Sequence, residues 1–173
     1  SNGTRTTWTI SWWVKRSTLS TGTSIAGAGS SGSAYFWMGF DSSNRLVFEE
    51  AAGGANTWYF RTTPLYRDPS AWYHIVAVLD TTQATSTNRV KLYVNGTQIT
   101  AFDTNTYPTQ NLNSSYWDAT SAHNIGAAIA AGTGYFGGYI TEFNFIDGQA
   151  LDPTSFGEFN TDTGVWQPKA YTG

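Results

Sequence analysis

Hydrophobic and polar residues alternate along much of this 173-residue chain. The clearest case is residues 7–16, where every second residue from Trp8 to Val14 is apolar. Because successive side chains of a β-strand point to opposite faces, this spacing predicts a strand with one buried face. Trp13 lies on the opposite, mostly polar face, where it is either covered by a neighbouring sheet edge or available to a ligand.

Further strands are predicted wherever apolar runs are separated by turn residues. Residues 34–40 are apolar at almost every position, so we expect that strand to be buried on both faces. Asn95-Gly96 is the strongest hairpin signal, since a type I′ turn needs positive φ at both central residues. Besides the strands at residues 7–16 and 34–40, we expect strands at residues 25–27, 45–50, 57–62, 72–80, 88–94, 97–102, 123–126 and 135–146.

Residues 103–121 are the longest segment without a clear strand pattern. They hold Tyr107, Tyr116 and Trp117 among Asn, Thr and Ser residues. Long loops inside a compact domain are usually either functional or poorly ordered. This segment is therefore the first place to look for ligand-binding residues.

Composition favours one all-β domain and excludes several function classes. Aromatic residues make up 16% of the chain and charged residues only 12%, which suits pleated, half-buried surfaces. We expect one domain across residues 1–173, with its core at about 7–153 and a C-terminal extension at 154–173. The net charge is −3 and no basic cluster exceeds Lys15-Arg16, so nucleic acid is not an expected partner. No apolar run approaches the ~20 residues that cross a bilayer, so we expect no membrane insertion.

The chain has no cysteine and does not begin with Met. Disulfide and thiolate chemistry are therefore excluded, and a bacterial or viral source is favoured over a secreted animal one. No signal peptide is evident, so we expect Ser1 to be a cut inside a longer protein.

Several motifs together resemble one family. One strand opens with Trp72-Tyr73-His74, and the next ends in Tyr-Val-Asn-Gly at residues 93–96. The later motifs are Ile125-Gly126, Phe136 to Phe143, and Gly148 to Leu151. This set resembles laminin-G-like domains of the concanavalin A-like lectin/glucanase superfamily, over roughly Trp8 to Pro153. The resemblance implies an all-β, two-sheet antiparallel jelly-roll β-sandwich.

A narrower resemblance concerns residues 14–17, 145–151 and 163–169. These segments are similar to domains that recur in marine bacteriophage structural proteins, such as tail fibres and other virion appendages. That likeness implies an extracellular or virion-surface location. It also implies other virion proteins, or copies of the same chain, as partners.

The acidic residues do not match the pattern of the family's enzymes. Its glucanases carry Glu-x-Asp-x-Glu or Glu-x-Asp-x-x-Glu along one strand, which aims the carboxylates into one groove. This chain has only four Glu residues, of which Glu49 and Glu50 are adjacent and must point to opposite faces. Glu142 and Glu158 stand apart. We therefore expect no enzyme, and we expect His74 to bond across the sheet.

Carbohydrate binding remains open, because it needs flat apolar faces beside amide or carboxylate groups. Candidate residues form three clusters. The first holds Trp117, Tyr116 and Asn113 with Asp118, the second Asn56 and Trp58, and the third Tyr35 and Trp37. The competing interpretation is that these aromatic rings fill the core or cap its ends. It is favoured for Trp58 and Trp37, and both interpretations stay open for Trp117.

Many relatives bind Ca²⁺ at one rim of the sandwich. Asp80, Asp103 and Asn124 are the expected ligands here, because hard oxygen donors on loops and strand ends suit this ion. No local calcium motif is present, so such a site would have to assemble in the fold.

Two functions follow from the sequence. The first is a non-catalytic, lectin-like module that adsorbs to surface polysaccharide or glycan, with weak single-site affinity raised by multivalency on a fibre. The second is a structural or protein-interaction module of a virion appendage that binds no sugar. The exposure of Trp117 distinguishes them: a concave ligand site in the first case, a contact between subunits in the second.

Overall fold

The computed structural model describes residues 3–128 and 134–173, and almost all of its regular structure is β-strand. The strands are β1 (Thr7–Arg16), β2 (Thr23–Ser31), β3 (Ala34–Phe40), β4 (Arg45–Ala52), β5 (Ala55–Leu65), β6 (Tyr73–Asp80), β7 (Val90–Val94), β8 (Thr97–Gln98), β9 (Phe102–Thr106), β10 (His123–Ile125), β11 (Gly138–Asp147), β12 (Gly157–Phe159) and β13 (Trp166–Pro168). Two short 3₁₀ turns, η1 (Ser86–Asn88) and η2 (Pro153–Ser155), complete it. Among the described residues there is no helix long and apolar enough to span a membrane.

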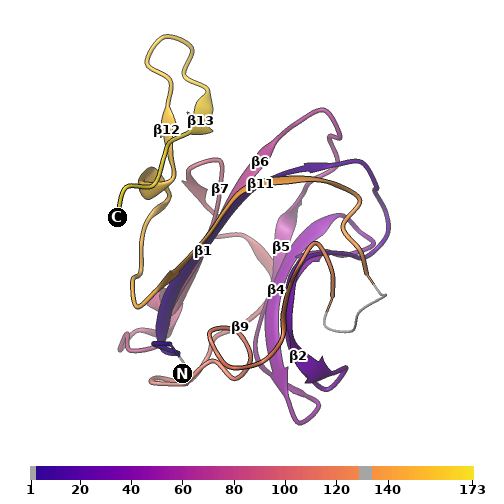
Figure 1. The fold of residues 1–173 in the computed structure, drawn as a ribbon, viewed down its shortest axis with the longest axis vertical. Helices are drawn as coiled ribbons and strands as arrows, with labels where there is room; N and C mark the ends of the chain where they lie inside the picture. The colour runs from indigo at the N-terminus through magenta and orange to yellow at the C-terminus, as the bar shows by residue number, and fades with distance from the viewer. Residues whose placement is uncertain (1–2, 129–133) are drawn as a thin grey trace.

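Two antiparallel sheets pack face to face (Figure 1). The five-stranded sheet has the order β11-β1-β6-β7-β8, and the six-stranded sheet has the order β10-β2-β3-β4-β5-β9. Strands β12 and β13 form a small separate hairpin near the C-terminus, at the top of Figure 1. The two-sheet jelly-roll sandwich predicted from the sequence is confirmed.

The core lies between the inner faces of the two sheets. The apolar side chains predicted for the first strand, from Trp8 to Val14 at every second position, are fully buried. Trp8 meets Phe36 and Phe48 of the opposite sheet edge-on, with ring centroids 6.0 and 6.1 Å away. Such aromatic pairs add to the large area that each ring buries. The hairpin turn is also as predicted, with φ of 49° at Asn95 and 77° at Gly96.

The loop predicted at residues 103–121 is partly wrong, because β9 occupies Phe102–Thr106. This strand has one apolar residue, Phe102, and pairs with a single neighbour, β5, at the sheet edge. Backbone hydrogen bonds hold it, so it needs no alternating pattern. The strand expected at residues 97–102 shrinks to β8, while the one expected at 25–27 extends to the whole of β2.

The C-terminal segment covers part of the outer face of the five-stranded sheet. Phe156 packs with Val76 and Val78 of β6 in a second buried cluster. Trp166 lies beside His74, with ring centroids 5.9 Å apart. Residues 154–173, predicted only as an extension, thus belong to the packed structure.

Candidate functional site

A buried carboxylate fixes the loop in which the ligand site was expected. Glu50 is fully buried and accepts hydrogen bonds from the hydroxyl of Ser114 at 2.7 Å and the backbone amide of Ser115 at 3.0 Å. Burial raises the pKa of Glu50, and these donors partly offset that shift. Glu49 points to the opposite face, as predicted from their adjacency. Glu50 therefore anchors the loop and faces no ligand.

Two indoles among the candidate sugar-binding residues belong to the core. Trp58 has no exposed surface and Trp117 is only 3% exposed. The Trp117 ring packs 4.7 Å from Phe36 and 4.8 Å from His123, between ring centroids. Their placement as sugar platforms is therefore corrected: in this fold both fill space between and beside the sheets.

The polar residues predicted beside them do not form one site. Asn113 is exposed on a loop, Asn56 is exposed near the start of β5, and Tyr116 is half-buried against the core. Asp118 borders a cavity of about 320 Å³, together with the edge of Trp117. Burial, and then the charge of nearby Asp147, raise the pKa of Asp118 to about 6.

The three expected calcium ligands do not converge. Asp103 lies on β9 and Asn124 on β10, at opposite edges of the six-stranded sheet. Asp103 pairs with Arg61, and the Asp80 carboxylate accepts bonds from Thr82 and Gln83. Within residues 3–128 and 134–173, no group of three acidic, His or Cys side chains is arranged to hold a metal ion. These residues do not fit a shared Ca²⁺.

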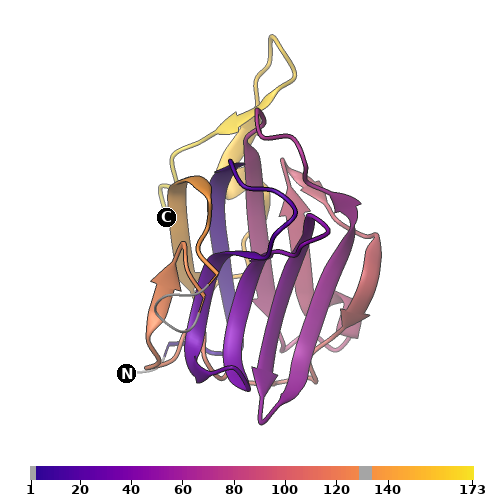
Figure 2. The ribbon, with the colours of Figure 1, turned by 90° about the vertical axis from the view of Figure 1, so that its right-hand side faces the viewer.

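The outer face of the six-stranded sheet carries a row of aromatic and polar side chains. Trp37 pairs with Glu49 across β3 and β4, and Glu49 pairs with Tyr59 across β4 and β5. Paired residues of antiparallel strands share one face, and the residues beside them along each strand fill the core. The six-stranded sheet is in front in Figure 2. Trp37, Glu49 and Tyr59 are all half-buried. We call these residues, with Tyr35, the sheet-face site.

Trp37 is held in a fixed position on this face. Its indole N–H donates to the hydroxyl of Ser24 at 2.6 Å. The ring lies across Gly39, where a Cβ would come within 2.8 Å of Trp37 Cζ2. The indole is therefore held next to Ser24 and Gly39 on the outer face of the sheet, where it is half-buried. The sequence favoured a core position for Trp37, and the structure corrects that prediction.

Hydrogen-bonding groups surround this indole. The Tyr35 hydroxyl donates to Glu49 Oε1 at 3.1 Å. Burial raises the pKa of Glu49, while the bond from Tyr35 lowers it in part. Arg61 lies one outward position further along β5 and pairs with Asp103. A ring platform thus stands beside a carboxylate, phenol groups and a guanidinium.

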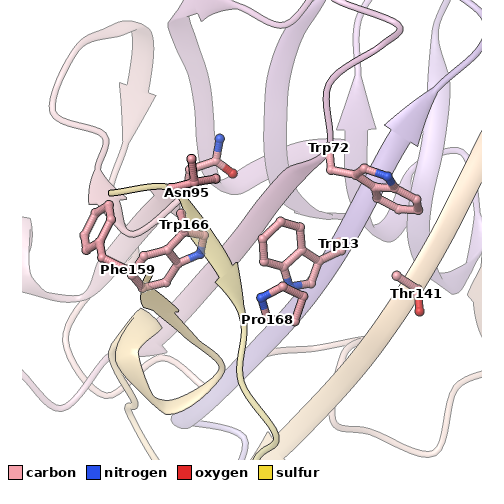
Figure 3. Close-up of a pocket in the computed structure, with 8 residues that line it drawn as sticks. Trp13, Trp72, Asn95, Thr141, Phe159, Trp166 and Pro168 are labelled. Atoms are coloured by element: carbon pink, nitrogen blue, oxygen red, sulfur yellow. The ribbon is translucent and has the colours of Figure 1, made fainter. Parts of the chain in front are cut away.

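A second concave feature lies between the five-stranded sheet and the C-terminal hairpin (Figure 3). It has a volume of about 590 Å³. We call it the hairpin groove, lined chiefly by Trp13, Trp72, Asn95, Thr141, Phe159 and Trp166. The sequence left the role of Trp13 open and did not indicate this groove, because half of it comes from the C-terminal extension.

The fold is similar to those of several solved structures at low sequence identity. Domain 4 of the arabinanase AbnA from Geobacillus stearothermophilus, solved with arabinotriose, matches with a TM-score of 0.57 and 18% identity, over 86% of this chain and 64% of that one. The CBM40 domain of the Ruminococcus gnavus IT-sialidase, solved with α2,3-sialyllactose, gives 0.59 and 16%, over 89% and 80%. A SAP-like pentraxin from Limulus polyphemus gives 0.54 and 15%, over 83% and 65%.

No curated protein sequence matches the chain. A family profile does match residues 1–155, and it describes the concanavalin A-like lectin/glucanases superfamily. That match spans most of the 173 residues and agrees with the two-sheet sandwich. This chain belongs to the concanavalin A-like lectin/glucanase superfamily.

Proposed function

We propose that this protein is a non-catalytic carbohydrate-binding module whose ligand lies on the sheet-face site. The observation that carries the proposal is the half-buried indole of Trp37, which Ser24 and Gly39 hold on the outer face of the sheet. The apolar C–H face of a sugar ring stacks on such a surface. Because the indole is already fixed, little side-chain entropy is lost when a ligand binds.

The surrounding groups supply orientation. Glu49 offers carboxylate oxygens to sugar hydroxyls, and Tyr35 and Tyr59 offer phenolic hydroxyls on either side of it. A sugar ring on Trp37 would thus meet donors and acceptors at its rim. This combination of one stacking face and a few polar groups is typical of sugar sites.

The same row argues against glycosidase chemistry. Glycoside hydrolysis needs a pair of carboxyl groups that flank the scissile bond. Glu50, the neighbour of Glu49, is buried behind the sheet, where Ser114 and Ser115 occupy its oxygens. Glu142 and Glu158 lie on other strands, β11 and β12. Binding without turnover is the function these positions support.

The similar structures support an oligosaccharide as the ligand class. The arabinanase domain was solved with arabinotriose and the CBM40 domain with sialyllactose. We extend the proposal to a module on a phage fibre or similar appendage that adsorbs to host surface glycans. That setting, with an extracellular or virion-surface location, rests on the sequence resemblance of residues 14–17, 145–151 and 163–169.

A binding screen tests the proposal. The purified protein would be applied to an array of neutral and acidic glycans, once with Ca²⁺ and once with EDTA, and hits measured by calorimetry. We expect selective binding that Trp37→Ala weakens at least about tenfold. Tyr139→Ala is the matched control, because this ring is 66% exposed on β11 of the other sheet. A blank array with folded, multimerised protein would contradict the proposal, and loss of binding in EDTA would add a metal to it.

One observation favours the structural, protein-interaction alternative. Apolar side chains at the hairpin groove are well exposed: Trp72 by 40%, Phe159 by 56% and Val165 by 62%. Such a patch can be covered by another protein chain. A concentration-dependent dimer in analytical ultracentrifugation, lost on Phe159→Ala, together with a blank array, would support this alternative.

A further inference from the structure

The hairpin groove is built on three contacting rings. Trp13 stacks on His74 with ring centroids 4.8 Å apart and planes at 19°. Trp166 lies beside the edge of His74, with centroids 5.9 Å apart and planes at 23°, and its indole N–H donates to His74 Nδ1 at 2.9 Å. Because Nδ1 accepts this bond, Nε2 carries the ring proton and donates to the hydroxyl of Ser11 at 2.9 Å. This stack joins the two halves of the groove.

Two glycines close the hairpin onto the sheet. A Cβ at Gly96 would come within 2.6 Å of the Trp166 ring, and one at Gly157 within 2.5 Å. Trp166 is therefore seated between the turn at the end of β7 and the hairpin's own first strand. The groove is pre-formed, which lowers the cost of ordering it around a ligand.

Aromatic surfaces remain open around this stack. Figure 3 shows Trp72, Trp13 and Trp166 in succession along the groove, with Phe159 at the far end. Trp72 and Phe159 are 40% and 56% exposed. The volume of about 590 Å³ lies within the usual range for small-ligand sites.

The polar groups of the groove are few and uncharged. Asn95 Oδ1 already accepts the backbone N–H of His74 at 2.8 Å, which leaves its amide N–H₂ group to donate. Thr141 contributes a hydroxyl at the other end (Figure 3). None of the residues that line the groove carries an ionisable side chain. A charged ligand would lose its hydration here without finding a partner.

The hairpin groove is not formed by the family-matched residues 1–155 alone. The family profile ends at residue 155, whereas Phe159, Val165, Trp166 and Pro168 come from the hairpin beyond it. The groove exists only because this hairpin packs on the outer face of the five-stranded sheet. Its ligand must therefore be inferred from its own chemistry.

We propose that the hairpin groove is a second carbohydrate site, which takes a short neutral oligosaccharide. This inference deepens the proposed function and rests on it for the class of ligand. Sugar rings stack on the exposed rings of Trp72 and Phe159, with the edge of Trp13 between them, while Asn95 and Thr141 bond to hydroxyls. The two sites then differ in charge: the sheet-face site holds Glu49 and Arg61, and the groove holds no charge. Two sites on opposite outer faces allow one module to bridge two chains of a polysaccharide.

Nuclear magnetic resonance of the indole N–H groups tests this inference in the whole protein. The chain has eight tryptophans, so every candidate surface reports in one spectrum. The probes are neutral trisaccharides of arabinose, glucose and mannose, and α2,3-sialyllactose as the charged comparison. We expect at least one neutral probe to shift the signals of Trp72 and Trp13. Trp72→Ala should weaken that binding at least about tenfold, while Trp37→Ala leaves it unchanged.

The outcomes separate the two sites. Shifts at Trp72 with none at Trp37 support the groove and overturn the sheet-face site, and the reverse result overturns the groove. If the signals of Trp72 and Trp13 shift with protein concentration but with none of the sugars, a second copy of the chain occupies the groove. That result overturns the inference. Trp72 is 40% exposed, so its replacement leaves the buried core intact.

Discussion

The outer faces of the two sheets differ in what covers them. On the six-stranded sheet, Trp37 lies on the surface beside Glu49 and Tyr59. On the five-stranded sheet, Trp13 is only 6% exposed, because His74 and the C-terminal hairpin pack around it. Both indoles occupy outward positions of strands whose other face fills the core. The difference comes from what the rest of the chain places over each face.

The comparison shows that an outward-pointing aromatic ring on a strand can stay exposed to a ligand or be buried by neighbouring residues. Trp37 has a glycine, Gly39, at the next outward position, and the ring lies down across it. Trp13 has a partner of similar shape, His74, directly across the strand pair. One ring is thus fixed and half-exposed, and the other is fixed and buried against His74.

The largest expected effect comes from removing the ring that seals the covered face. Trp166→Ala deletes a 9% exposed indole and its bond to His74. We expect the free energy of unfolding to fall by about 3–5 kcal/mol in urea denaturation. Phe159→Ala, at a 56% exposed ring of the same hairpin, should cost far less. Equal losses in the two variants would show that Trp166 does not seal this face.

The pH dependence of stability follows from the same stack. Burial lowers the pKa of His74 from 6.5 to about 4, so the folded protein holds the ring neutral. The unfolded chain takes up the proton first. Stability is therefore complete above pH 6.5 and is lost as the pH falls toward 4, by about 3 kcal/mol.

Denaturation of the wild-type protein and His74→Gln at pH 7.5 and at pH 4.5 measures this effect. The difference between the two proteins isolates His74 from Asp118, whose raised pKa acts with the opposite sign. We expect the variant to lose less stability than the wild type between these pH values. Parallel losses would mean that His74 is not held neutral in the folded protein.

A smaller effect is expected where Trp37 lies on the open face. A Cβ at Gly39 would come within 2.1 Å of the Thr23 carbonyl oxygen and 2.8 Å of the Trp37 ring. Gly39→Ala should therefore cost about 1–3 kcal/mol and displace the indole, with loss of sugar binding in calorimetry. Gly22→Ala is the matched control, because nothing lies within 4 Å of its Cβ position. Unchanged sugar binding in Gly39→Ala would contradict the role of the flat indole.

The smallest change in stability is expected for Tyr35→Phe. It removes one hydrogen bond, the 3.1 Å contact with Glu49, and keeps the ring. The loss in stability should be about 0.5–1.5 kcal/mol. The pKa of Glu49 should rise further, since the Tyr35 hydroxyl lowers it in the wild type. Titration of the Glu49 carboxyl carbon by nuclear magnetic resonance would show this, and an unchanged pKa would contradict it.

Much of the fold could be predicted from the sequence, and less of the site. The alternating pattern from Trp8 to Val14 predicted which face of β1 is buried, and Asn95-Gly96 predicted the turn between β7 and β8. Both signals are local in the sequence. Strand β9 escaped prediction because an edge strand needs only a backbone partner. Whether an aromatic ring of the sheet-face site or of the hairpin groove is exposed or covered depends on segments that are distant in the sequence. The local pattern does not contain that information.

Trp117 and Trp37 show the limit most clearly. The polar residues around Trp117 suggested an exposed loop. In the structure, Ser114 and Ser115 of this loop donate hydrogen bonds to the buried Glu50, which holds the loop against the core. The apolar run around Trp37 looked like core, yet a glycine and a serine hold its ring on the surface. A contact with a residue distant in the sequence, Glu50 for the Trp117 loop and Ser24 for Trp37, helped decide each position, and the local pattern does not show it.

The central claim is that sugar binds on the open face of the six-stranded sheet. A crystal structure of the protein with its tightest array ligand tests this most directly. The account predicts a sugar ring stacked on Trp37, with a hydroxyl bonded to Glu49. A ligand bound at the Asp118 cavity or at the hairpin groove, with Trp37 bare, would contradict it.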